Sequence, residues 1–257
     1  MTSKQVLLTL VVVVTCLTGC SLFGPRRAPE LVSPYPETRV IAVVPFVNES
    51  GTTAADGQRV ADSLTRSLDR SEGLVALPLT RVLTVMDQLG LSGVSSMGEA
   101  RMLLQYLDAE LLVVGTITAY DPYDPPRLGM AAEVYEYLAP PVQMVDLRVM
   151  TKAGTSNETA PDERHSGRVL VSLSAMLDAS NPRTRDRLMD YAVDRGVRPE
   201  DPDAWLHIKR SMNLYTDFAC HELARRLLAA ETIRLAPAEP DETRGSDNDR
   251  PKRVGHR

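Results

Sequence analysis

Two runs of apolar residues constrain the fold of this 257-residue chain more than any other feature. Residues 39–47 and 110–118 are both rich in valine, leucine and isoleucine, and neither run alternates with polar residues through its centre. A strand that is apolar on both faces is normally covered on both faces, so each run is predicted to be a central strand of a sheet. The rest of the chain must then supply covering layers for both sides.

Amphipathic segments follow the first run and precede the second. Helical spacing of apolar residues is present near 54–71, 79–89 and 98–107, and residues 74–77 form a short apolar segment after Gly73. The order strand, helix, strand, helices, strand is what a parallel or mixed sheet with helical crossovers requires.

The pattern changes after residue 119. Apolar and polar residues alternate over 145–149 and 169–174, and residues 128–137 are a further candidate strand. Alternation with period two is typical of antiparallel strands with one wetter face. The fold class is therefore predicted as α/β, a mixed β-sheet flanked by helices.

The last part of the chain has helical signals. Asn181-Pro182 predicts a helix to about residue 193, and Asp201-Pro202 repeats that signature. An apolar stripe then predicts one long helix ending near Glu231; its members are Trp205, Ile208, Met212, Tyr215, Ala219 and Leu223. This C-terminal helical extension either packs on the sheet or presents a face to a partner.

The first twenty residues have the form of an export signal. Lys4 precedes an apolar run, Val6 to Leu17, that is too short to cross a bilayer as a mature helix. The run ends in Leu17-Thr18-Gly19-Cys20, which resembles the lipobox of bacterial lipoproteins. The resemblance implies cleavage before Cys20, acylation of that cysteine by fatty acids such as palmitate, and, since Ser21 follows in place of aspartate, an outer-membrane address facing the periplasm. The alternative is an ordinary secretory signal that leaves Cys20 unmodified.

These signals divide the chain into five parts. We expect a lipoprotein signal peptide at 1–19, an acylated cysteine with a proline-rich tether at 20–38, and the α/β domain at 39–177. C-terminal helices packed on the domain follow at 178–235. The charged residues 236–257 are expected to be a disordered tail.

Composition and motifs argue against several functions. A formal net charge of −5 gives no electrostatic reason to bind nucleic acid. Phosphate-binding and nucleophile motifs are missing, and the four histidines lack metal spacing, so no catalytic residue, metal site or cofactor is predicted. In a chain cleaved before Cys20, Cys220 is the remaining free thiol; it is expected to be a buried residue.

The segment Tyr120–Pro126 is the one unusual surface motif. Its prolines interrupt regular structure, and Tyr120 and Tyr123 would either cap the core or contact a partner. Together with Trp205 they are the candidate partner-binding residues.

Three segments carry a resemblance to known families: VIAVVPFVNESG at 40–51, LPLTRVLTVMDQLGL at 77–91 and EARMLLQYLDAELLVVGTIT at 99–118. They are similar to the core pattern of the curli-secretion lipoprotein CsgG, the N-terminal domain of TolB and the penicillin-binding-protein activator LpoB. The resemblance covers about residues 39–154. It implies an anticodon-binding-like α/β fold and a non-enzymatic role, and it carries over no catalytic residue. Residues 178–230 lie outside the pattern, and no β-propeller follows as in TolB.

The function expected from the sequence is that of an adaptor or accessory factor for envelope assembly, in wall synthesis, secretion or appendage formation. Its partners would be the membrane, through the lipid, and periplasmic or outer-membrane proteins, including further copies of itself. The alternative is an oligomeric CsgG-like secretion channel subunit whose segments near 128–137 and 169–177 insert into the membrane. A hydrolase is a third reading, for which the sequence offers no nucleophile–base pair.

Overall fold

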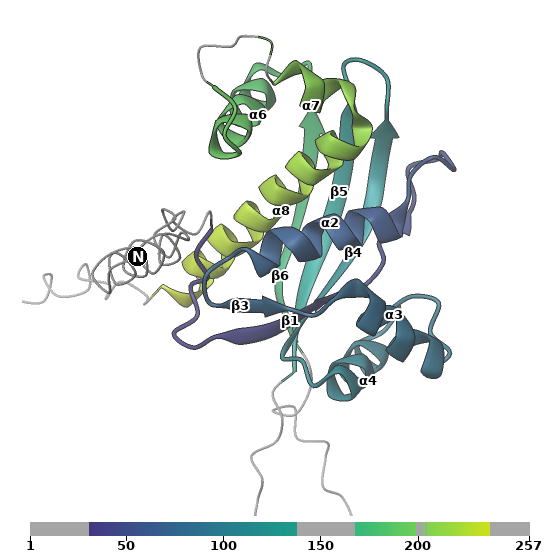
Figure 1. Ribbon diagram of the computed structural model, residues 1–257. Coiled ribbons are helices and arrows are strands. Elements are labelled where there is room, and N and C mark those ends of the chain that lie inside the picture. Colours follow the sequence, from purple (N-terminus) through teal and green to yellow (C-terminus); the bar gives the residue numbers. More distant parts are fainter. Residues whose placement is uncertain (1–30, 138–167, 199–202, 204, 237–257) are drawn as a thin grey trace, which may run out of the picture. The chain divides into compact units, whose positions relative to one another are not determined.

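The two apolar runs become strands that lie side by side in the sheet. The computed structural model describes residues 31–137, 168–198, 203 and 205–236 (Figure 1). The chain divides into two units after Glu30, and every described residue belongs to the second unit. In it β1 (Arg39–Val43) pairs in parallel with β4 (Leu111–Asp121), with Ile41 opposite Leu111.

The sheet is mixed, as predicted. Its order is β3-β1-β4-β5-β6, with β3 (Leu74–Ala76), β5 (Arg127–Glu136) and β6 (Arg168–Asp178), while the short β2 (Val47–Asn48) also pairs with β4. The pairs on the β3 side are parallel and the pairs β4–β5 and β5–β6 are antiparallel. The change falls where the sequence pattern changes from apolar runs to alternation. The strand expected at 145–149 and the loop around it lie outside the described residues.

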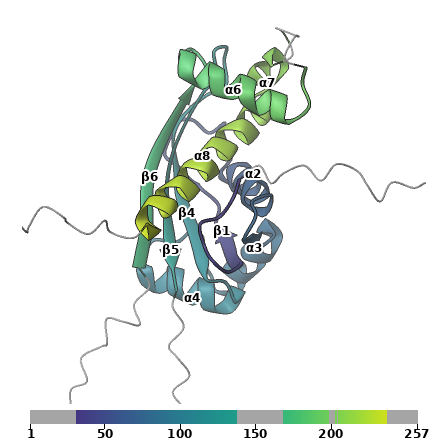
Figure 2. The ribbon, with the colours of Figure 1, turned by 90° about the vertical axis from the view of Figure 1, so that its left-hand side faces the viewer.

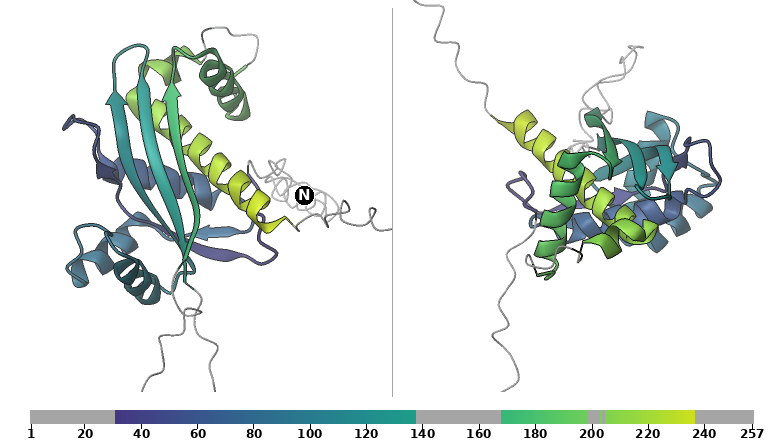
Figure 3. Two further views of the ribbon diagram at one scale, coloured as in Figure 1. Left: turned by 180° about the vertical axis from the view of Figure 1, so that it is seen from behind. Right: turned by 90° about the horizontal axis from the view of Figure 1, so that it is seen from above.

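Helices cover the two faces of the sheet unequally. On one face lie α2 (Gly57–Asp69) and the long α8 (Met212–Leu235), which cross the strands in Figure 1. On the other face α3 (Leu79–Gln88) and α4 (Met97–Leu107) cover only the β1 end (Figure 2). Successive residues of β1 therefore enter separate cores: Ile41 and Val43 belong to the core that contains α2. Ala42, and Val44 just after the strand, belong to the core that contains α3 and α4. The rear view in Figure 3 shows long strands with no described helix over their upper part.

Local signals explain where the helices start. Asp56 Oδ1 accepts hydrogen bonds from the backbone N–H groups of Gln58 and Arg59 and so caps α2. Asn181 does the same for α6 (Pro182–Asp194), with the proline at the first helical position as predicted. Among the described residues, no helix is both long enough and apolar enough to cross a membrane.

The prediction of one continuous helix from residue 202 to Glu231 is wrong. A short helix α7 (Leu206–Arg210) ends at Ser211, whose backbone is extended with φ −108° and ψ 109°, and α8 begins at Met212. Serine competes with the helical backbone for hydrogen bonds and favours helix ends, while the apolar stripe continues across the break. Ile208, Tyr215 and Leu223 are all buried in the same core, so the pattern alone did not reveal the interruption.

The segment predicted as a tether is bound to the domain over its described part. The Ser33 N–H donates to the Glu72 carbonyl at 2.8 Å, and the Glu72 N–H donates to the Leu31 carbonyl at 2.9 Å. Farther along, the Tyr35 hydroxyl donates to Glu231 Oε2 at 2.9 Å, near the end of α8. The part of the tether before residue 31 lies outside the described residues.

A chain of ion pairs surrounds this attachment. Glu136 is 3% exposed and lies between Arg39, at 2.5 Å, and Arg168, at 3.0 Å. The Arg39 guanidinium also stacks 4.7 Å from the Tyr35 ring, and Arg234 pairs with Glu231 at 2.7 Å. We call this set the Glu136–Glu231 network; it consists of Tyr35, Arg39, Glu136, Arg168, Glu231 and Arg234.

Candidate functional site

The hairpin between β4 and β5 carries the tyrosines singled out in the sequence. Tyr120 is half-buried at the end of β4 and packs against the core. Burial, followed by the nearby charge of Asp56, raises the pKa of Tyr120. Tyr123, at the hairpin tip, has 80% of its surface exposed. One tyrosine therefore lies against the core and the other faces solvent.

Helix α7 is joined to this hairpin. Lys209 Nζ lies 2.7 Å from Asp124 Oδ1, and the Lys209 side chain is mostly buried. Trp205 directly precedes α7 and packs half-buried against the core. The fold thus brings together the elements that carry Tyr123 and Trp205, although they are 82 residues apart.

A cleft lies where α2, α6, α7 and α8 meet. Its volume is about 310 Å³. The lining residues are Ser63, Arg66, Ser67 and Arg70 from α2, Tyr191, Arg195 and Val197 from the end of α6, His207 and Ile208 from α7, and Leu214 and Asp217 from α8. We call this the α7 cleft.

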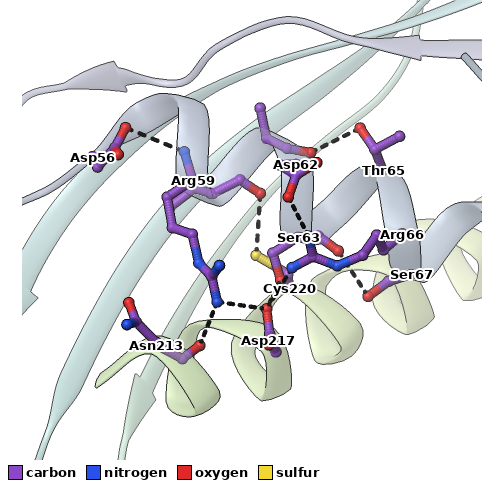
Figure 4. Close-up of polar contacts among 12 residues, drawn as sticks. Asp56, Arg59, Asp62, Ser63, Thr65, Arg66, Ser67, Asn213, Asp217 and Cys220 are labelled. Carbon is purple, nitrogen blue, oxygen red and sulfur yellow. Dashed lines mark hydrogen bonds and ion pairs between the residues drawn. The ribbon is translucent and has the colours of Figure 1, made fainter. Parts of the chain in front are cut away.

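Asp217 is the one carboxylate in the lining of the α7 cleft, and it already has hydrogen-bond and ion-pair partners within the protein (Figure 4). Asp217 Oδ1 accepts a hydrogen bond from Ser63 Oγ at 2.6 Å and from Arg66 Nη2 at 2.9 Å, with Arg59 Nη2 at 3.4 Å. Arg66 also pairs with Asp62. Burial lowers the pKa of Arg66, but the two carboxylates outweigh it and raise the pKa overall. Arg66 and Asp217 therefore form an ion pair within the wall of the cleft, and their charges neutralise each other.

The remaining charged groups of the α7 cleft are basic. The Arg195 guanidinium stacks 3.4 Å from the centroid of the buried Tyr191 ring. Arg70 and His207 are exposed, and neither side chain has a hydrogen bond or ion pair with another described residue. The lining of the cleft thus combines these basic side chains with apolar residues that include Val197 and Ile208.

Reactive groups near the cleft are poorly suited to catalysis. Cys220 lies under the seam between α2 and α8, fully buried, with its Sγ 3.5 Å from the Val60 carbonyl oxygen. Burial raises the pKa of Cys220 to about 12, so the thiolate that would act as a nucleophile is scarce near neutral pH. Across the described residues, no group of three or more His, Cys, Asp or Glu side chains is placed to hold a metal ion.

Sequence reasoning missed the α7 cleft. The lining residues 63, 66 and 67 of α2, and Arg70 directly after it, fall in the segment near 54–71 that was predicted only as an amphipathic helix. Their spacing puts them on one stripe, which is the only sequence signal for this wall. Cys20, the predicted lipidation site, lies outside the described residues.

Comparison with known proteins gives similarities of structure alone. No protein-family model matches the chain, and no curated protein matches it in sequence. Among solved structures it is similar to the LpoB C-terminal domain from Salmonella enterica, at 12% identity and a TM-score of 0.36 over 58% of this chain and 86% of that one. It is also similar to lipoprotein GNA1162 from Neisseria meningitidis, at 17% identity and a TM-score of 0.38 over 61% of this chain and 96% of that one.

A third similar structure is the hypothetical protein CT253 from Chlamydia trachomatis. It has 14% identity and a TM-score of 0.38 over 76% of this chain and 99% of that one. The resemblance to LpoB expected from the sequence is thus confirmed as a likeness in the arrangement of helices and strands. At these values nothing about partners or assembly transfers to this chain.

Proposed function

We propose that this protein is a lipid-anchored adaptor of the bacterial envelope, attached at Cys20 and acting without catalysis. The observation that carries the proposal is the position of Tyr123. It is 80% exposed at the tip of a hairpin that the Asp124–Lys209 ion pair holds against α7. An exposed aromatic ring on a fixed element is typical of the residues that protein partners bury.

The competing functions have less support. The wholly buried Cys220 thiol and the pairing of Ser63 with Asp217 offer no activated nucleophile among the described residues. The segments proposed for membrane insertion form β5 and β6, and Leu128 and Leu177 point into the core on the α8 side. Inserting these strands into a bilayer would remove them from that packing.

Crosslinking in living cells tests the proposed surface. A photoreactive amino acid replaces Tyr123, and in a matched control it replaces Tyr106, which is 64% exposed on α4. We expect a discrete adduct with an envelope protein from position 123 and none from position 106. Identical adducts from both positions, or none from position 123, would contradict the proposed surface.

A separate experiment tests the anchor. Labelled palmitate should be incorporated into the wild-type protein and not into the Cys20→Ala variant, and only the wild type should remain with the membrane fraction after a salt wash. Equal membrane retention of the two proteins would contradict attachment through Cys20.

A further inference from the structure

We propose that a cleft between the start of α6 and the middle of α8 binds a phosphate group. The proposal goes beyond the adaptor function and does not depend on it. The cleft has a volume of about 600 Å³ and lies next to Leu177, near the end of β6 (Figure 2). We call it the α6 cleft. Among the described residues, it shares no lining residue with the α7 cleft.

A buried hydroxyl group in the α6 cleft has no hydrogen-bond partner. Thr184 is 7% exposed and lines the cleft from the first turn of α6. Its hydroxyl makes no hydrogen bond within the described part of the chain, whereas Thr65 and Thr216 each donate to the carbonyl oxygen one helical turn earlier. Buried polar groups are nearly always hydrogen-bonded, because an unpaired one costs free energy. A ligand oxygen in the cleft would supply the missing acceptor.

The start of α6 favours a negative charge at the same place. Pro182 has no N–H group, and the Arg183 N–H already donates to Asn181 Oδ1 at 2.9 Å. The helix therefore acts through the positive end of its dipole, equivalent to about half an elementary charge. Thr184 is the third residue of α6, within the turn where this field is strongest. The ligand is therefore expected to be an anion.

Arginine side chains reach the α6 cleft from both helices. Arg183 and Arg187 are one turn apart on α6, and Arg225 and Arg226 are on α8. Arg225 is bound to Glu222 through Nε and Nη2, at 3.1 and 2.9 Å. The side chains of Arg183 and Arg226 make no hydrogen bond or ion pair with any residue that the structure describes. Guanidinium groups on two sides suit the several oxygens of a phosphate group.

The acidic residues of α6 lie away from the buried side of the helix. Thr184 and Leu188 mark that side, since both are buried. At about 100° per residue, Arg187 is closer to it than Asp190, and Asp186 lies almost opposite. The order of the side chains around α6 therefore places positive charge nearer the buried hydroxyl than negative charge.

The charge of the complete lining agrees with a phosphate group. Four arginines and three carboxylates line the α6 cleft, which leaves one positive charge. The start of α6 adds about half a charge. A phosphate monoester carries about −1.5 to −2 near pH 7 and has three strong acceptor oxygens. A carboxylate has less charge and only two acceptor oxygens, so it would satisfy fewer of these donors.

Binding of inorganic phosphate to the full-length purified protein, in a non-ionic detergent, tests the proposal. Equilibrium dialysis with radiolabelled phosphate measures the dissociation constant and the stoichiometry. We expect one saturable site with an affinity that falls as salt rises, and no displacement by an equal concentration of acetate. Glycerophosphoglycerol, the soluble headgroup of phosphatidylglycerol, distinguishes the sources of the group. Displacement of phosphate by it indicates a lipid headgroup, and no displacement indicates free phosphate or a monoester.

Single substitutions localise the site. Thr184→Val keeps the shape of the side chain and removes the hydroxyl, so it should weaken phosphate binding about tenfold without destabilising the fold. Thr184→Ser should retain binding. Arg226→Gln should also weaken binding about tenfold. Arg70→Gln, in the α7 cleft, is the matched control and should leave binding unchanged. Thr184→Ala provides the same test should the valine variant fail to fold.

Four results would overturn the proposal: no saturable phosphate binding, displacement by acetate, an affinity that Thr184→Val or Arg226→Gln leaves unchanged, and an equal loss in Arg70→Gln. The dialysis experiment requires neither a partner protein nor attachment at Cys20. A missing Tyr123 adduct would therefore reject the adaptor surface without affecting the α6 cleft, and a failure of phosphate binding would leave the adaptor proposal intact.

Discussion

The two ends of α8 hold similar charged residues in opposite ways. At the Leu235 end, the carboxylates of the Glu136–Glu231 network are paired: Glu136 and Glu231 are each 3% exposed, and each meets an arginine within 3.0 Å. At the Met212 end, Arg70 and His207 line a cleft without partners among the described residues. Along α8, Asp217 of the cleft and Glu231 of the network are about 21 Å apart, at 1.5 Å per residue.

The difference indicates which charged side chains contribute to stability and which contribute little to it. A buried ion pair is costly to break, because the remaining charge stays away from water. An exposed, unpaired arginine contributes little to folding and keeps its capacity to bind a ligand. The comparison therefore makes opposite predictions for arginines at the two ends.

Arg39→Ala should have the largest effect, lowering the free energy of unfolding by about 3 kcal/mol. The variant leaves the buried Glu136 with Arg168 alone and also removes the cation stacked on Tyr35. Urea unfolding followed by circular dichroism measures it, with Arg101→Ala as the matched surface control. Equal stabilities of the two variants would remove the distinction between the ends.

The next largest effect should come from acid, which weakens the Glu136–Glu231 network. Burial raises the pKa of Glu136, but hydrogen bonds from Arg39 and Arg168 outweigh it, so the folded-state pKa lies below its ordinary value. Such a group stabilises the fold above its unfolded pKa of about 4.3, and this stabilisation is lost as pH falls through the folded value. The stability advantage of wild type over Glu136→Gln should therefore be full at pH 7 and shrink below about pH 4. A constant difference across that range would contradict the assignment.

Asp217→Ala should have an intermediate effect of about 1–2 kcal/mol. The variant removes the acceptor shared by Ser63 and Arg66, but Asp217 is 29% exposed and water partly replaces it. Chemical denaturation measures the loss, and Asp87→Ala on the exposed side of α3 is the control. A loss as large as that of Arg39→Ala would mean that Asp217 contributes as much to stability as the ion pairs at the Leu235 end of α8.

Arg70→Glu should have the smallest effect on folding, within about 0.5 kcal/mol of wild type. The residue is exposed at the end of α2 and has no ion pair among the described residues. The same denaturation series measures it. A destabilisation comparable to that of Asp217→Ala would show that Arg70 has a structural partner and would weaken the comparison.

Much of the fold was predictable because its signals are local. The apolar run at 39–47 is recognisable as a central strand because helices cover both of its faces, α2 on one and α4 on the other. The period-two pattern near 169–174 correctly predicts the strand β6. Helices α3 and α4 follow their predicted ranges to within a residue or two. These elements depend on spacing within about ten residues, which a single sequence displays.

The α7 cleft was not predictable because no local signal describes it. Arg66 and Arg70 have the spacing of an ordinary solvent-facing stripe, and only the packing of α6 and α7 over them makes a cavity. The break at Ser211 was hidden because the apolar stripe continues from Ile208 to Tyr215. The cleft depends on contacts between segments more than 100 residues apart, and the break depends on the backbone angles of one residue. Neither feature changes the spacing of apolar residues along the sequence.

The pairing of residues 31–33 with Glu72 has a mechanical consequence. A force applied to the chain ahead of Leu31 acts first on the two backbone hydrogen bonds of the parallel bridge between Val32 and Glu72. It acts next on the hydrogen bond from the Tyr35 hydroxyl to Glu231. Such a load is shared between the start of the sheet and the end of α8 before it reaches β1. A force applied ahead of Leu31 would therefore have to break these hydrogen bonds before it acts on the strands of the sheet.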